Sequence, residues 1–290
     1  MRFAPLPDSS QRESQAREAT QYNRRMQTKF SLDQIREFWT QQAREHGTAP
    51  SASWSDRMVI EMEVREIVKR LSDGDRILDI GCANGYSTVQ FAAQRKAHVR
   101  GIDYIAGMIE QARQRLAGLV GQLQGSVEFD LGDVTALEEP SGAYDKVVVV
   151  RVIINLGEWP RQLRGLRECA RVLKPGGTLL LSEATVQGWE RLNQFRREWR
   201  LEDIPMPGFN QYLDEGRVIE AVSHDLDLVE LVNFASTYYV GTRLLKPLLD
   251  QAMGGAIGVA DPNMEWNRWF SELPAWGDYG TQKLFVFQKR

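Results

Sequence analysis

The sequence lacks the residues that several classes of protein require. Only two cysteines and three histidines occur among its 290 residues. They cannot supply the disulfide framework of a small secreted domain, and their spacing is not that of a structural zinc site, so we expect no metal. The longest apolar run, residues 147–156, is interrupted by Arg151 and Asn155 and is too short to span a bilayer.

An excess of charge of one sign is also lacking. The chain carries 36 Lys and Arg against 39 Asp and Glu, and its pI is about 5.8. No global basic field is therefore present to attract nucleic acid. The first fifteen residues contain no apolar segment of the kind found in secretory signals. We expect a cytoplasmic protein without a membrane partner, either as a single chain or as a homodimer.

The composition changes along the chain and predicts three parts. Residues 1–18 are polar and are expected to form a disordered tail. Residues 19–56 are expected to form a helical cap, with a helix over about 22–43. Residues 57–290 should form the core, opened by a helix that Asp56 caps, with a lid insertion at about 186–226 and a helical insertion at about 241–280.

Within the core, short β-branched runs alternate with helical patterns. Strands buried on both faces and separated by helices are typical of a parallel, doubly wound α/β sheet. Past residue 182 this rhythm is broken by a charged helix at about 188–201. We expect seven strands in all, placed at residues 76–80, 97–102, 127–131, from 144 onward, 178–182, near 228–238 and at 284–288.

The strongest chemical signal is the segment ILDIGCANG at residues 77–85, between a predicted strand and a predicted helix. Glycines in such a turn allow a ligand to approach the backbone closely, and the following helix start favours an anionic group. Asp103 ends the next strand, where a carboxylate can bind both hydroxyls of a ribose. A dinucleotide-binding turn would need glycine at Ala83 and a third glycine further on, and neither is present.

These residues resemble the class I S-adenosylmethionine-dependent methyltransferases over about residues 57–182 and the last strand. The matching markers are the turn from Asp79 to Gly85, the acid Asp103, the pair Gly132-Asp133, the pair Tyr144-Asp145, and the turn at residues 173–177. The sequence departs from the family pattern at Ala83-Asn84, where many members carry Gly-Thr or Gly-Ser. We interpret this as subfamily variation that makes the Asn84 amide available to the cofactor.

The resemblance implies S-adenosylmethionine as the cofactor and S-adenosylhomocysteine as the product. The turn would hold the methionine part, Asp103 the ribose, and Asp133 with the Val134 N–H the adenine. Trp39 and Trp54 are expected either to pack within the cap or to contact the cofactor when the cap closes over it. The full predicted cofactor set is Asp79, Gly81, Cys82, Ala83, Asn84, Gly85, Asp103, Tyr104, Met108, Asp133, Val134, Arg151, Trp39 and Trp54.

The acceptor site is expected beyond the carboxyl ends of the strands. Glu183, directly after the fifth strand, is a candidate base or an orienting group, with a structural role as the alternative; His224 is a second candidate base. A lid over residues 188–216 could receive an anionic acceptor on its arginines or pack an aromatic one. The predicted acceptor residues are Asn155, Asn193, Arg196, Arg197, Phe209, Tyr212 and Tyr239.

The sequence therefore predicts a methyltransferase that acts on a small molecule, plausibly one of secondary metabolism. Two alternatives remain open at this point. One is an RNA methyltransferase, which the acidic pI and the lack of an added RNA-binding module disfavour. The other is a non-catalytic protein that retained the fold and its cofactor.

Overall fold

A seven-stranded sheet forms the centre of the computed structural model, which describes residues 29–119, 121–255, 261–262 and 264–290. The strand order is β3-β2-β1-β4-β5-β7-β6. β7 runs antiparallel to the other six strands of this sheet, which are parallel to one another. The predicted seven-stranded, mostly parallel sheet is confirmed. The strands are β1 (Arg76–Ile80), β2 (His98–Asp103), β3 (Ser126–Leu131), β4 (Tyr144–Val150), β5 (Leu173–Ala184), β6 (Leu226–Val232) and β7 (Gln282–Lys289).

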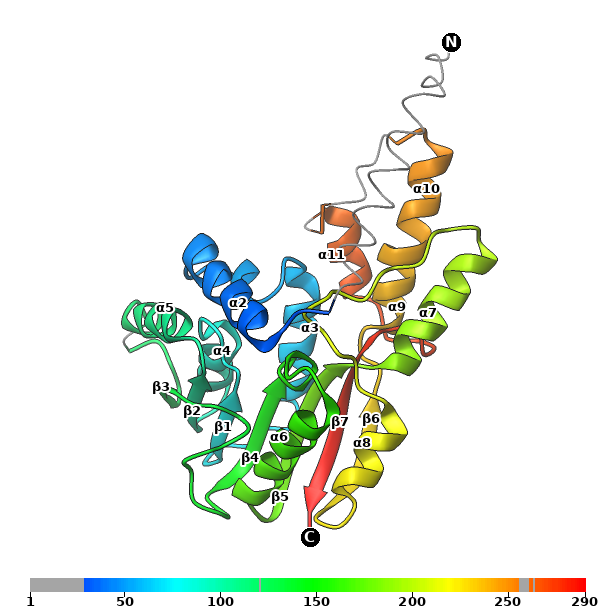
Figure 1. Cartoon of the computed structure of the whole chain (residues 1–290). Coiled ribbons are helices and arrows are strands. Elements are labelled where there is room, and N and C mark those ends of the chain that lie inside the picture. The colour runs from blue at the N-terminus through cyan, green and yellow to red at the C-terminus, as the bar shows by residue number, and fades with distance from the viewer. Residues whose placement is uncertain (1–28, 120, 256–260, 263) are drawn as a thin grey trace.

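Helices cover both faces of this sheet (Figure 1). One face packs against α6 (Trp159–Val172) and α8 (Glu215–Val222). The other packs mainly against α3 (Arg57–Val68). The remaining helices are α2 (Leu32–His46), α4 (Tyr86–Gln94), α5 (Ala106–Ala117), α7 (Val186–Glu198), α9 (Ser236–Tyr239), α10 (Lys246–Ala252) and α11 (Glu265–Ser271), with a π-helical segment at Val240–Leu245.

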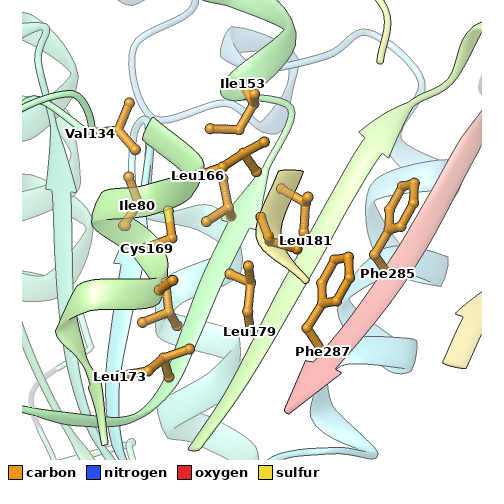
Figure 2. Close-up of a cluster of buried hydrophobic side chains, with 14 of the residues drawn as sticks. Ile80, Val134, Ile153, Leu166, Cys169, Leu173, Leu179, Leu181, Phe285 and Phe287 are labelled. Atoms are coloured by element: carbon orange, nitrogen blue, oxygen red, sulfur yellow. The ribbon is translucent and has the colours of Figure 1, made fainter. Parts of the chain in front are cut away.

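The two sides of the core follow from the alternation of side chains along each strand. Val147 and Val149 of β4 face α6, whereas Val148 between them faces α3. Figure 2 shows the first side, where Leu179 and Leu181 of β5 and two phenylalanines of β7 meet Leu166 and Cys169 of α6. Cys169 is thus a small core residue. Each large apolar side chain buried in this way contributes roughly 1.5–3 kcal/mol.

One predicted boundary in the second half was wrong. The strand expected to run to residue 238 ends at Val232, and Tyr238 belongs to α9. The lid region also contains a helix that the sequence analysis did not assign, α8, whose N-cap Asp214 accepts from the Arg217 backbone N–H at 2.7 Å. Aromatic residues favour strands only weakly, so packing of Tyr238 and Tyr239 against the α3 side of the core overrides that preference. The predicted tail at residues 1–18 lies outside the described residues.

The cap helix α2 lies over the carboxyl ends of the strands (Figure 1). Ser31 caps its start in a capping box with Gln34. Near its N-terminus, Phe38 stacks on Phe209 with ring centroids 4.5 Å apart, and the Phe30 N–H donates to the Gly208 carbonyl at 2.9 Å. The cap and the loop at residues 199–213 are therefore packed against each other.

The insertion between β6 and β7 is anchored on the start of α3. Asp56 caps α3 as predicted, accepting from the Val59 N–H. Its carboxylate also accepts from the Tyr238 hydroxyl at 2.7 Å and from Arg243 at 2.6 Å. This buried acid is therefore one of the contacts that join the segment carrying α9 to α11 to the core, together with the packing of Phe270 against the α3 side.

Glu63 of α3 is almost completely buried, with 2% of its surface exposed. Its carboxylate pairs with Arg151, which follows β4, and accepts from Ser182 of β5 and from Gln282 of β7. Four separate elements therefore meet at one carboxylate. A buried charge with this many partners is tolerated, but removing it leaves those partners unsatisfied.

We predict that Glu63→Ala lowers the free energy of unfolding by about 3 kcal/mol, because it leaves the Arg151 charge without its partner. Urea denaturation measures this loss. The matched control is Glu66→Ala on the same helix, which removes the surface pairs to Lys69 and Arg70 and should cost less than about 1 kcal/mol. Equal losses in the two variants would contradict the importance of the buried network.

Candidate functional site

A cavity of about 290 Å³ opens where β1 and β4 lie side by side. The chain leaves β1 toward α4 on one face of the sheet and leaves β4 toward α6 on the other, so the two following loops separate there. Open parallel sheets bind ligands at this switch point. Most of the predicted cofactor residues line the cavity: Asp79, Gly81, Cys82, Ala83, Asn84, Asp103, Tyr104, Met108, Asp133, Val134, Arg151 and Trp39.

The glycines of the turn after β1 are required by space and conformation. Gly81 has φ +71°, and a Cβ placed on it would lie 2.1 Å from Cγ2 of Val152. Gly85 has φ +72°, and its Cβ would lie 2.6 Å from the ring of Phe129. Gly85 does not line the cavity. It therefore shapes the start of α4, whereas Gly81 leaves room beside the cavity.

Two buried carboxylates face the cavity. Asp103 accepts from the backbone N–H groups of Ala83 at 3.0 Å and Ile105 at 2.9 Å, and burial raises its pKa to about 6 against the opposing effect of these bonds. Asp79 accepts from the Thr88 hydroxyl at 2.6 Å, and burial raises its pKa to about 7, with the charge of Asp103 adding to the effect. Both acids are held by few donors and are suited to accept more from a ligand.

Asn84 joins the turn to the cap rather than offering its amide N–H groups to a ligand. Its Nδ2 donates to the carbonyls of Gly47 at 2.9 Å and Ala49 at 2.7 Å. The prediction that the whole amide serves the cofactor needs this correction, because both N–H groups are occupied. Its Oδ1 is buried at the cavity wall and has no hydrogen-bond partner among the described residues. Only this oxygen remains for a ligand.

At the other end of the cavity, Asp133 and Val134 follow β3. Asp133 Oδ1 accepts from the backbone N–H and the hydroxyl of Thr135, both at 2.8 Å. Tyr104 lies at the same cavity, with the guanidinium of Arg36 5.5 Å from its ring centroid. This end of the cavity therefore combines an oriented carboxylate with flat and apolar surfaces, as a purine base requires.

The loop after β4 forms the wall beneath the cap. Arg151 has φ +55°, an uncommon conformation for a residue with a Cβ, and its guanidinium lies 5.0 Å from the ring centroid of Trp54. Trp39 Nε1 donates to Asn155 Oδ1 at 3.2 Å, and Asn155 Nδ2 donates to the Arg151 carbonyl at 2.7 Å. Trp39 and Asn155 reach the cavity, whereas Trp54 contributes indirectly by packing against Arg151.

Glu183 lies behind this loop and does not line the cavity. Its carboxylate accepts from the N–H groups of Val152 at 2.8 Å and Ile153 at 2.7 Å, and burial raises its pKa to about 8. It positions the loop from below. The His224 side chain is 96% exposed and lies two residues before β6, at the sheet edge opposite the carboxyl ends. The structure therefore brings neither predicted base to the cavity.

Most of the predicted acceptor residues also lie elsewhere. Asn193 exchanges hydrogen bonds with the backbone of Ile204, and Arg196 donates to the carbonyls of Glu202 and Arg243. Arg197 pairs with Asp203 at the surface, and Tyr239 is buried in the core. These side chains already have partners within the protein, which sequence spacing could not reveal.

Phe209 and Tyr212 line a second cavity of about 460 Å³, which shares Ile35 with the first. The cap also contributes residues to the first cavity that the sequence analysis missed. The helical spacing of apolar residues predicted helix α2, but it could not show that this helix lies over the carboxyl ends of the strands. These missed cap residues are Leu32, Asp33, Ile35, Arg36 and Ser53.

Within the described ranges, no helix combines the length and the apolar character needed to cross a membrane. Among the same residues, no group of three or more His, Cys, Asp and Glu side chains is arranged to hold a metal ion.

Comparisons with known proteins agree with this geometry. A family model described as a methyltransferase domain matches residues 77–177. Methyltransferase GfsG of Streptomyces halstedii is 28% identical over 242 residues, which are 79% of each chain. The 27-O-demethylrifamycin SV methyltransferase of Amycolatopsis mediterranei is 34% identical over 113 residues, 39% of this chain and 40% of that protein. The chain thus spans about two fifths of the length of this second relative.

Solved structures show the same fold. The Haloferax volcanii complex of the Trm112 methyltransferase activator with the putative methyltransferase matches with a TM-score of 0.55 and 16% identity, over 87% of this chain and 96% of that one. Magnesium protoporphyrin IX methyltransferase of Synechocystis, with SAH bound, matches with a TM-score of 0.54 and 14% identity, over 81% and 86%. At these identities the likeness concerns the fold alone.

The fold is Rossmann-like, and its cavity lies at the switch point between β1 and β4, where sheets of this kind bind their ligands. Residues 77–177 match a methyltransferase domain, and the fold is that of the class I S-adenosylmethionine-dependent methyltransferases, with S-adenosylmethionine as the cofactor. The residues present fit that group. Two buried carboxylates, the free Oδ1 of Asn84 and the space beside Gly81 are suited to its ammonium, hydroxyl and methionine parts.

Replacing Asp103 should weaken binding of S-adenosylhomocysteine. We expect Asp103→Ala to lose roughly 1.5–3 kcal/mol of binding free energy, because a charge-assisted contact to the ribose is removed. Isothermal titration calorimetry measures the change. Asp130→Ala, a surface acid that pairs with Arg100 and Arg113, is the control and should bind normally. Unchanged affinity in a folded Asp103→Ala protein would exclude Asp103 as the ribose ligand.

The raised carboxylate pKa values also predict a pH dependence of binding. A ligand ammonium or hydroxyl prefers the ionised acid, so affinity should increase as pH rises through about 6 and about 7. We expect S-adenosylhomocysteine to bind roughly tenfold more weakly at pH 6 than at pH 8, since each pH unit below a pKa reduces the ionised fraction about tenfold. Asp79→Asn should flatten this profile. Constant affinity of the unaltered protein from pH 6 to 8 would contradict it.

Proposed function

We propose that the protein transfers a methyl group from S-adenosylmethionine to a small-molecule acceptor. The observation that carries the proposal is the arrangement at the switch point, where Asp79 and Asp103 lie at a cavity that cap helix α2 covers. The relatives support an acceptor of modest size, since one of them is named as a rifamycin methyltransferase. A role in secondary metabolism is consistent with that name.

Methyl transfer is an in-line displacement, for which S-adenosylmethionine supplies an electrophilic methyl group. The protein can contribute by orienting the two reactants and by excluding water. Trp39, Asn155 and Arg151 form a continuous chain of contacts between the cap and the loop after β4. These contacts fix the position of the cap over the cavity relative to the sheet. Positioning of this kind can remove a large part of the activation barrier of a bimolecular reaction.

We place the acceptor between the cap and the loop at residues 199–213. Phe38, Trp39 and Phe209 form an aromatic cluster there, and the ring centroids of Phe209 and Trp39 are 5.8 Å apart. The second cavity begins at the same cluster and adds Tyr212 and Trp159 as walls. Aromatic walls with a few polar groups suit an aromatic or partly apolar acceptor. We therefore assign acceptor contacts to Asn155, Phe209 and Tyr212 and not to Arg196 or Arg197.

For Glu183 we propose a positioning role. Its bonds to two consecutive N–H groups hold the loop that presents Arg151 and Asn155. An acceptor that needs deprotonation would lose its proton to a group at the cavity or to solvent. The pKa of about 8 then reflects burial of a structural carboxyl group.

The proposed function predicts that methyl-labelled S-adenosylmethionine will transfer its label to a small molecule. A panel of phenolic, carboxylic and amine acceptors, with total RNA as a separate sample, should yield label in an organic fraction and none in RNA. The Asp103→Ala variant is the control and should lose most of this transfer. Label in RNA would favour the RNA alternative. Tight cofactor binding with no transfer to any acceptor would favour a non-catalytic protein.

A further inference from the structure

We infer that Arg161 is a cofactor contact at the adenine end of the cavity; this inference rests on the proposed use of S-adenosylmethionine. Arg161 lies in the first turn of α6 and lines the cavity. Its Nε is buried and has no hydrogen-bond partner, and its guanidinium forms no ion pair with any described residue. Buried polar groups in folded proteins are nearly always satisfied, so an unpaired one at a cavity wall indicates a missing partner.

Other arginines of this region show what a satisfied guanidinium looks like. Arg171, on the same helix, donates to Glu168, to the carbonyls of Leu137 and Glu139, and to Ser141. Arg151 pairs with Glu63 and lies over Trp54. Arg161, in contrast, lines the cavity and has a buried donor atom, Nε, that pairs with no acceptor in the described part of the chain.

The position of Gly165 shows which end of the cavity Arg161 reaches. Gly165 lies one turn further along α6, and residues four apart share a helix face. A Cβ at Gly165 would lie 3.1 Å from Cδ1 of Leu156 and 3.5 Å from Cγ2 of Val134. Helix side chains lean toward the N-terminus, so Arg161 continues past this contact toward the cavity. Leu156 and Val134 both line that cavity.

Arg161 is therefore at the end where Asp133 and Val134 lie and away from the turn at Gly81. A guanidinium is planar, stacks on aromatic faces and donates N–H groups, which a purine ring with its acceptor nitrogens can use. Asp133 offers the opposite property, since it accepts from an exocyclic amine. A base with both an amine and ring acceptors, as adenine has, satisfies both side chains at once.

The test is calorimetric titration of S-adenosylhomocysteine into the full-length protein. Arg161→Ala should bind about tenfold more weakly, since a desolvated stacking or charged hydrogen-bond contact is typically worth a factor of this size. Arg161→Lys should recover only part of the loss, because the ammonium cannot stack as a plane. The matched control is Arg164→Ala, which replaces an exposed arginine three residues further along the same helix. This variant should bind S-adenosylhomocysteine as the unaltered protein does.

Competition with 5′-methylthioadenosine, which lacks the amino-acid part, assigns the contact to one end of the ligand. The same tenfold loss for both ligands in Arg161→Ala supports the inference. Affinity for S-adenosylhomocysteine within twofold of the Arg164→Ala control overturns it, as does a loss confined to S-adenosylhomocysteine. Failure of the unaltered protein to bind S-adenosylhomocysteine would instead refute the proposed function, so the two outcomes are distinguishable.

Discussion

The close approach of Gly81 to Val152 is the constraint on which the site depends. β1 and β4 are neighbours in the sheet, and the loops that follow them must separate to opposite faces. At Gly81 the absence of a Cβ and a φ of +71° let the two loops touch before they part. The cavity opens directly above this contact, so its floor is set by one missing side chain. A larger residue at this position would collide with Val152 unless the backbone shifted.

The loop after β4 is then held from both faces of the sheet. Glu183 binds its backbone from the α6 side, and Glu63 binds the Arg151 side chain from the α3 side. Neighbouring residues of a strand point to opposite faces, which is why Ser182 joins the Glu63 network while Glu183 does not. Glu183 and Glu63, on opposite sides of the sheet, thus fix the loop after β4. This explains how Arg151 can retain an uncommon backbone conformation.

Burial disfavours the ionised form of the two carboxylates that face the cavity. Burial raises the pKa of Asp79 to about 7 and of Asp103 to about 6. Because these folded-state values exceed those of an unfolded chain, the two acids reduce stability as pH rises from about 4 to 7. A bound ammonium and ribose would relieve that penalty. Binding and folding are thereby linked through the same two side chains, and the unpaired Nε of Arg161 adds a further group that a ligand would satisfy.

The sequence by itself determined the sheet, the glycine turn and the acids at the strand ends, because these depend on local spacing. Asp79 and Asp103 lie at the carboxyl ends of β1 and β2, Asp133 follows β3, and parallel strands bring their carboxyl ends to one edge. Tertiary structure alone decided how the cap, α7 and α8 lie on that edge. The Asn84 amide donates to the carbonyls of Gly47 and Ala49, and the Arg196 guanidinium donates to the Glu202 carbonyl, because tertiary packing placed those acceptors within reach. Such contacts join residues far apart in the chain and leave no periodic signal in the sequence.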